Sequence, residues 1–182
     1  MHPAQLTEAD HDPAFVLQTE RLILRRFRLS DAEFIVGLLN EPSFLRNIGD
    51  KGVRTIEEAH GYLLSGPIDS YQRMGFGLYL TIRKADGVPI GMCGLLKRDS
   101  LPDVDIGFAF LPSCWRQGFA FESAFAVIEH GRSDFGLSRI VAVTNIDNHD
   151  SIRLLARLGF VFERLVRLSE PGDELRLMAK AL

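Results

Sequence analysis

A segment near the middle of the chain combines residues that could bind an anion. It reads LPSCWRQGFAFESAFAVIEH over residues 111–130 and places Arg116, Gln117 and Gly118 where a strand is expected to give way to a helix. The first backbone N–H groups of a helix have no internal partner and lie at the positive end of its dipole, so the main chain alone can hold a phosphate there. Gly118 lets the backbone approach closely, and Arg116 can add a charge-assisted hydrogen bond. An ordinary turn with a solvated arginine is the alternative.

This segment differs from two widespread phosphate-binding patterns. It contains neither the glycine-rich fingerprint of dinucleotide-binding folds nor the lysine of a P-loop. NAD and ATP are therefore not the expected ligands.

Hydrophobic periodicity predicts the elements that hold the segment in place. The strand before it is expected over residues 104–111 (VDIGFAFL), where Gly107 favours a bulge or a close backbone approach. The helix after it has an apolar face at Phe121, Ala124, Phe125 and Ile128. The other expected strands cover residues 19–28, 76–84, 88–98, 139–143, 160–168 and 174–182, and the other expected helices cover residues 30–39, 55–66 and 148–158.

Capping residues indicate where three of the helices begin. Ser30 is expected to cap the first helix, and Thr55 with Glu58 forms a capping-box pattern for the second. The second helix should stop near Gly66-Pro67, and Asn148 can cap the last one.

The order of elements predicts an α/β (α+β) fold with a mostly antiparallel sheet of six to seven strands, flanked by about four helices. The strand at 104–111 is followed by a helical crossover to the strand at 139–143, so these two run parallel if they are adjacent. We expect a single domain over residues 19–182, preceded by a flexible lead-in over residues 1–18.

Composition narrows the possible partners. The chain has 182 residues and a formal net charge of −3, which gives no general attraction to nucleic acid or to an anionic membrane. No apolar run approaches the ~20 residues of a membrane span, and the N-terminus does not resemble a signal peptide. Cys93 and Cys114 lack the spacing of a zinc or redox site. The expectation is a reduced, cytoplasmic protein without a metal.

Two motifs in order give the sequence a specific resemblance. The stretch DIGFAFLPSCWRQGFAFES and the later stretch NIDNHDSIRLLARLGF are similar to the GNAT acetyltransferase superfamily, in the branch of the RimJ/RimL-like ribosomal-protein N-terminal alanine acetyltransferases. The matching positions are Pro112, Trp115, Gly118, Ala120, Asn148, Ser151, Ile152, Leu158, Gly159 and Phe160. The opening stretch TERLILRRF also resembles the family, so the likeness covers nearly everything from residue 19 onward.

The resemblance implies acetyl-CoA as the co-substrate, bound between two splayed parallel strands. It implies that the pantetheine arm lies along the backbone of Phe110 and Leu111, and that Asn148 holds this arm, caps its helix or does both. The backbone amides that it assigns to the pyrophosphate are those of Arg116, Gln117, Gly118, Phe119 and Ala120.

The same resemblance suggests two catalytic side chains. Asp105 occupies a position where relatives often carry glutamate and is the first candidate base, with a solvated or strand-edge acid as the alternative. Glu170 is the second candidate. The tyrosine that many members of the superfamily use as an acid is Leu155 here, and Ser151 is the replacement that the ribosomal-protein branch favours. Ser151 can equally be an ordinary residue of the first helical turn.

The predicted function is an N-acetyltransferase that transfers the acetyl group to a primary amine by direct attack. The amine is either a protein N-terminus or a small molecule, and the enzyme is expected to act as a monomer or homodimer. A CoA-binding sensor or interaction module with a degraded active site is the alternative, and an anion-binding regulator without CoA is a third possibility.

Overall fold

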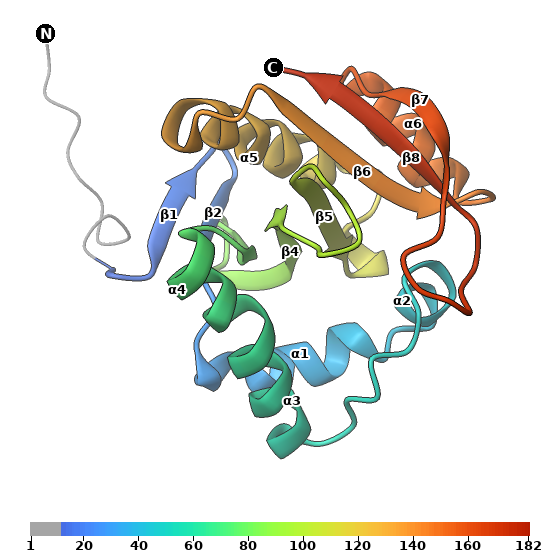
Figure 1. Cartoon of the computed structure of the whole chain (residues 1–182). Coiled ribbons are helices and arrows are strands. Elements are labelled where there is room, and N and C mark those ends of the chain that lie inside the picture. Colours follow the sequence, from blue (N-terminus) through green and yellow to red (C-terminus); the bar gives the residue numbers. More distant parts are fainter. Residues whose placement is uncertain (1–11) are drawn as a thin grey trace, which may run out of the picture.

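The computed structural model describes residues 12–182 and contains one eight-stranded sheet (Figure 1). The strand order across the sheet is β1-β2-β3-β4-β5-β6-β8-β7, and every neighbouring pair is antiparallel except β5 and β6. The predicted mixed fold with one parallel pair is therefore confirmed. The strands are β1 (Phe15–Gln18), β2 (Leu22–Arg26), β3 (Leu78–Arg83), β4 (Val88–Leu96), β5 (Asp105–Phe110), β6 (Arg139–Asn145), β7 (Val161–Val166) and β8 (Leu175–Ala181).

Helices cover both faces of the sheet. In Figure 1, α1, α3 and α4 lie together on one side of the central strands, and α5 lies on the other side. Separate hydrophobic clusters lie on the two sides: one joins Ile35 and Leu63 to Leu80, and the other joins Val127 and Leu95. The helices are α1 (Ala32–Leu39), α2 (Pro42–Asn47), α3 (Ile56–Leu63), α4 (Asp69–Met74), α5 (Phe119–Phe135) and α6 (His149–Arg157), with 3₁₀ turns at Leu29–Asp31 and Pro112–Cys114 and a π-helical turn at Leu64–Ile68.

The prediction of a flexible lead-in over residues 1–18 is wrong for its last four residues. Phe15–Gln18 form the edge strand β1, in which Phe15 pairs with Arg25 and Leu17 with Leu24. A four-residue strand is too short to show a clear alternating pattern, but its Val16 and Leu17 side chains pack against the core. This strand brings the sheet to eight strands instead of the expected six to seven. Residues 1–11 lie outside the described part of the chain.

The helix starts were predicted with mixed success. The capping box of α3 is confirmed, because Thr55 Oγ1 accepts from the Glu58 N–H at 3.2 Å and Glu58 Oε2 accepts from the Thr55 N–H at 3.0 Å. Ser30 does not cap α1, because it lies inside the 3₁₀ turn that precedes this helix. The Asp31 carboxylate is held there by Arg25, with Nη2 and Oδ1 2.7 Å apart.

The expected stop at Gly66-Pro67 is wrong. The helical segment continues through the π-helical turn Leu64–Ile68 into α4. It ends at Gly75, which has a φ of 80°. Proline has no backbone N–H to donate to an i−4 carbonyl, and the wider π turn accommodates Pro67 where a regular α-helix would kink.

The parallel strands β5 and β6 meet at one point only. Asp105 is in register with Val141, and the Val141 N–H donates to the Val104 carbonyl at 3.0 Å. Within residues 12–182 no further β5–β6 pairing follows, so the two strands separate toward their carboxyl ends. The expected splay is therefore present.

The bulge that was one explanation for Gly107 is absent. The β4–β5 ladder runs from the pair Gly91–Phe110 to the pair Leu96–Asp105 without a register shift. The atoms closest to a Cβ on Gly107 belong to side chains and not to backbone, with Leu96 Cδ1 at 2.6 Å.

Candidate functional site

The chain between β5 and α5 turns through two left-handed residues. Arg116 has a φ of 59° and Gly118 has a φ of 85°, with Gln117 between them. The left-handed region costs a residue with a side chain roughly 1–2 kcal/mol, whereas glycine enters it freely. Successive N–H groups in such a turn converge on one side and form a concave anion-binding surface.

The backbone N–H groups of this turn are available to a ligand. No N–H from Arg116 to Phe121 donates to an acceptor in the described part of the chain, and the first donor of the new helix is Glu122, whose N–H bonds the Gly118 carbonyl at 3.0 Å. The predicted absence of internal partners for these amides is thus confirmed. They lie at the positive end of the 17-residue helix α5, which adds to their attraction for an anion.

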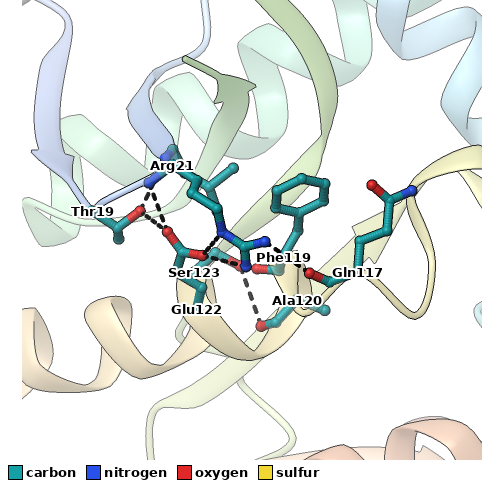
Figure 2. Close-up of polar contacts among 8 residues, drawn as sticks. Thr19, Arg21, Gln117, Phe119, Ala120, Glu122 and Ser123 are labelled. Atoms are coloured by element: carbon teal, nitrogen blue, oxygen red, sulfur yellow. Dashed lines mark hydrogen bonds and ion pairs between the residues drawn. The ribbon is translucent and has the colours of Figure 1, made fainter. Parts of the chain in front are cut away.

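Arg21, just before β2, fixes the turn against the start of α5 (Figure 2). Its Nη1 donates to the Gln117 carbonyl at 3.0 Å, and its Nε donates to Glu122 Oε2 at 2.7 Å. Its guanidinium carbon lies 4.6 Å from the centre of the Phe119 ring. No local sequence pattern predicts this role, because Arg21 and Glu122 are 101 positions apart.

Glu122 is the one acid in the first turn of α5, and three donors hold its carboxylate. Besides Arg21 Nε, the Arg21 backbone N–H donates to Oε1 at 2.9 Å and Thr19 Oγ1 donates to Oε1 at 2.5 Å. Partial burial alone would raise the pKa of Glu122, but these hydrogen bonds outweigh it and lower the pKa. The carboxylate therefore stays ionised, and its charge is offset by the adjacent guanidinium.

Successive residues of β5 direct their backbone N–H groups alternately toward β4 and toward β6. The Leu111 N–H donates to Ile90 across β4, and its carbonyl accepts from the Cys114 N–H, both at 2.9 Å. The Leu111 N–H, which was predicted to face the pantetheine arm, is therefore engaged within the sheet, and its carbonyl already accepts one hydrogen bond. By the two-residue alternation of a strand, Phe108 and Phe110 direct their N–H groups toward β6 instead.

In Phe110, the backbone N–H points toward β6, but the carbonyl already has a hydrogen-bond partner. Its carbonyl accepts from the indole Nε1 of Trp115 at 2.8 Å. Trp115, one of the positions that match the family pattern, thereby connects the start of the turn to the end of β5.

At the opposite end of β5, Asp105 is buried, with 1% of its surface exposed. Both of its oxygens accept from Arg98 Nε, at 3.0 and 3.2 Å. Desolvation raises the pKa of Asp105, and the attraction of Arg98 offsets that rise only in part. The site thus contains a buried carboxylate with a raised proton affinity, as a general base requires.

Helix α6 brings Asn148, Ser151 and Leu155 to the β6 side of the gap. Asn148 caps the helix as predicted, with its Oδ1 accepting from the Ser151 N–H at 3.2 Å. The Ser151 hydroxyl has no hydrogen-bond partner within residues 12–182 and is half-buried. Leu155 is buried and offers no acid where a tyrosine is common.

A continuous cleft of about 1230 Å³ runs between these elements. It contacts α2, α3 and α4 on one side and the turn, α5 and α6 on the other. Eight of the predicted site residues line this cleft: Asp105, Phe110, Arg116, Gly118, Phe119, Ala120, Asn148 and Ser151.

Three other candidates lie outside this lining. Leu111 and Gln117 do not border the cleft, and the Gln117 side chain donates to the Ser113 carbonyl at 2.9 Å. Glu170, the second candidate base, is exposed in the loop between β7 and β8 and does not border the cleft. Two further aromatic side chains, Phe44 and Tyr62, border the cleft.

The described residues contain neither a grouped metal-ligand set nor a membrane-spanning helix. No three His, Cys, Asp or Glu side chains among residues 12–182 are grouped so that they could hold a metal ion. No helix in this range combines the length and the apolar character needed to cross a bilayer.

Sequence comparison connects the chain to a protein family. The family model of the acetyltransferase (GNAT) domain matches residues 21–161. YoaA of Bacillus subtilis (strain 168), an uncharacterized N-acetyltransferase, is 32% identical over 154 residues, which cover 84% of this chain and 86% of YoaA.

Solved structures share the fold at lower identity. An acetyltransferase from Agrobacterium tumefaciens str. C58 superposes with a TM-score of 0.78 at 21% identity, covering 91% of this chain and 94% of that one. RimL, a ribosomal L7/L12 alpha-N-protein acetyltransferase solved in complex with coenzyme A, superposes with a TM-score of 0.79 at 19% identity, covering 92% and 98% of the two chains. At these identities, the two likenesses show that the fold is shared.

Proposed function

Because this chain belongs to the acetyltransferase (GNAT) family, we propose that it transfers an acetyl group from acetyl-CoA to a primary amine by direct attack. The run of free backbone N–H groups from Arg116 to Phe121 carries the proposal, because it provides an anion site in the same cleft as the buried Asp105. A diphosphate fits this donor set, since each amide can bond an oxygen and Arg116 can add charge.

The pantetheine arm is expected to follow the edge of β5 that faces β6. The N–H groups of Phe108 and Phe110 point into this gap, and an amide-bearing chain can pair with them as an added strand would. Asn148 borders the cleft on the opposite side.

Bound acetyl-CoA supplies the acyl carbonyl and a thiolate leaving group. Asp105 takes the proton that the attacking nitrogen loses as the C–N bond forms and the C–S bond breaks. Ser151, whose hydroxyl is free and borders the cleft, donates a hydrogen bond to the departing sulfur. An α-amino group with a pKa of about 7.7 to 8.0 is partly neutral near pH 7, so a modest base suffices for such an acceptor.

The test is turnover with a panel of peptides and small amines, followed by thiol release and by mass spectrometry of the products. Asp105→Asn is expected to lower kcat by about 10²-fold or more, the range of general-base catalysis, and Ser151→Ala by about tenfold. Product formation that neither substitution changes would remove both catalytic assignments.

A second candidate function is a CoA-binding module without turnover. The ion pair between Asp105 and Arg98 favours it, because it restrains the only buried carboxylate that borders the cleft among residues 12–182. Tight CoA binding with no acetylated product from any acceptor would favour the module over the enzyme.

A further inference from the structure

The half of the cleft near Asp105 contains three side chains with hydrogen-bond donors that have no acceptor within residues 12–182. They are the Nη1 and Nη2 groups of Arg98, the ammonium of Lys51 and the hydroxyl of Tyr62, and all three residues border the cleft. Arg98 uses only its Nε to bond Asp105, so its two terminal groups remain free to bond a ligand.

Two of these donors carry like charges that lie near one another. The pKa of Lys51 is lowered, mainly by partial desolvation and to a smaller extent by the charge of Arg98. Lys51 nevertheless retains solvent access at the rim of the cleft. Asp99 also borders the cleft but forms no ion pair with either cation in the described part of the chain. An anion between Lys51 and Arg98 would relieve their repulsion and accept from both.

This group of donors is separate from the proposed pyrophosphate site. Arg98 is bound to Asp105 at the first residue of β5, whereas the free amides follow the last residue of this strand. Six residues of extended chain span roughly 17 Å at about 3.3 Å per residue. Arg98 therefore lies at the end of β5 opposite the proposed pyrophosphate site and beside the proposed base, which the acceptor amine must reach.

We propose that the acceptor amine carries an anionic group, a carboxylate or a phosphate, that binds between Lys51 and Arg98 with the Tyr62 hydroxyl as a third donor. This inference rests on the proposed acetyltransferase function and narrows its substrate class. Binding of the anionic group there holds the amine of the same molecule beside Asp105. Uncharged amines would lack this anchor.

The first test compares matched acceptors that differ only in charge. The pairs are an α-amino acid and its amide, a peptide with Glu and the same peptide with Gln at its second position, and phosphoethanolamine and ethanolamine. We expect kcat/KM to be about tenfold higher for the anionic member of at least one pair, equivalent to about 1.4 kcal/mol of binding. The preferred pair distinguishes a carboxylate from a phosphate. Equal rates within every pair would overturn the inference while leaving the acetyltransferase proposal intact.

Variants of the two residues outside the catalytic machinery sharpen the test. Lys51→Gln and Tyr62→Phe should raise KM for the anionic acceptor about five- to tenfold, with little change for its uncharged match or for acetyl-CoA. Arg73→Gln is the matched control, because Arg73 also borders the cleft but is paired with Asp69 on α4. An equal effect of Arg73→Gln would indicate only the general charge of the cleft and contradict a specific site.

A binding measurement keeps the inference testable even without turnover. Saturating CoA occupies the amide site, and inorganic phosphate is then titrated into the complex by calorimetry. Phosphate should bind to the wild-type complex and more weakly to Lys51→Gln. The proposed anion site would be contradicted if phosphate did not bind, or if Lys51→Gln bound phosphate as tightly as the wild type. The absence of acetylated product in the same preparation would count against the proposed function alone.

Discussion

The guanidinium of Arg21 and the carboxylate of Glu122 form an ion pair across the start of α5, with Nη2 and Oε2 2.6 Å apart (Figure 2). The pair places a positive charge over the one acidic side chain in the first turn of this helix. Because the adjacent amides are proposed to bind a diphosphate, an uncompensated carboxylate there would repel the ligand. Arg21 thus connects β2 to the electrostatics of the anion site.

Removal of this charge should weaken CoA binding. Arg21→Gln leaves the ionised Glu122 carboxylate near the diphosphate and also frees the Gln117 carbonyl. We expect Kd for CoA to rise about tenfold, which corresponds to about 1.4 kcal/mol. Calorimetric titration with CoA measures this change.

The double variant Arg21→Gln/Glu122→Gln separates charge from structure. If repulsion is the cause, the second substitution restores most of the affinity. Arg132→Gln is the matched control, because Arg132 pairs with Glu129 on the exposed side of the same helix. An unchanged Kd in Arg21→Gln would show that the pair has no part in ligand binding.

Gly118 offers a second test, since α5 has a left-handed glycine at each end. Gly118→Ala puts a Cβ atom 3.2 Å from Arg21 Nη2 at a φ of 85°, so we expect a loss of about 1–2 kcal/mol in the free energy of unfolding. The distorted turn should also bind CoA about tenfold more weakly. Urea denaturation and calorimetry measure the two effects.

Gly136→Ala is the matched control for this substitution. Gly136 has a φ of 62° and open space where a Cβ atom would lie. It should therefore lose a similar amount of stability while its Kd for CoA stays at the wild-type value. Equal loss of CoA affinity in both variants would mean that general destabilisation explains the result.

The two cysteines should differ in their reaction with N-ethylmaleimide. Cys93 is fully buried, and desolvation raises its pKa to about 12, so it should react only after unfolding. Cys114 borders the cleft and should react slowly in the native protein. Acetyl-CoA at ten times its Kd should slow that reaction about tenfold, because the bound ligand covers the site. Acetyl-CoA is used instead of CoA because it has no free thiol that would react with the reagent. Peptide mapping by mass spectrometry follows both residues. A rate for Cys114 that acetyl-CoA leaves unchanged would place the ligand elsewhere.

The parts of the site that could be predicted from sequence are those with local signals. The turn before α5 combines Gly118 with the start of an amphipathic helix, and its amides are free as expected. The Thr55 and Glu58 capping box and the Asn148 cap also follow from residue types at short spacing. Each depends on interactions within one helical turn, which the sequence order itself determines.

The rest depends on register and on contacts between distant segments. Leu111 was assigned to the pantetheine arm, but the β4–β5 register turns its N–H toward Ile90, and a shift by one residue would have reversed this outcome. Arg21 and Arg25 alternate with Leu22 and Leu24 as the solvated side of a strand does, yet both arginines bind acids outside β2. Ion pairs of this kind leave no periodic pattern in the sequence.

The buried carboxylate of Asp105 should give stability a distinctive dependence on pH. Burial raises its pKa in the folded protein above the unfolded value of about 3.9. Between the two values the native state keeps a proton that the unfolded chain has released, so this group's contribution to stability falls as pH rises through the folded pKa. The Asp105→Asn variant has no carboxyl group at this position and therefore lacks this titration. Urea denaturation between pH 4 and pH 7 measures the free energy of unfolding of the wild type and of Asp105→Asn. The wild-type value minus the variant value should decline as pH rises and then level off. A difference that grows with pH would show that the Arg98 ion pair outweighs the cost of burial.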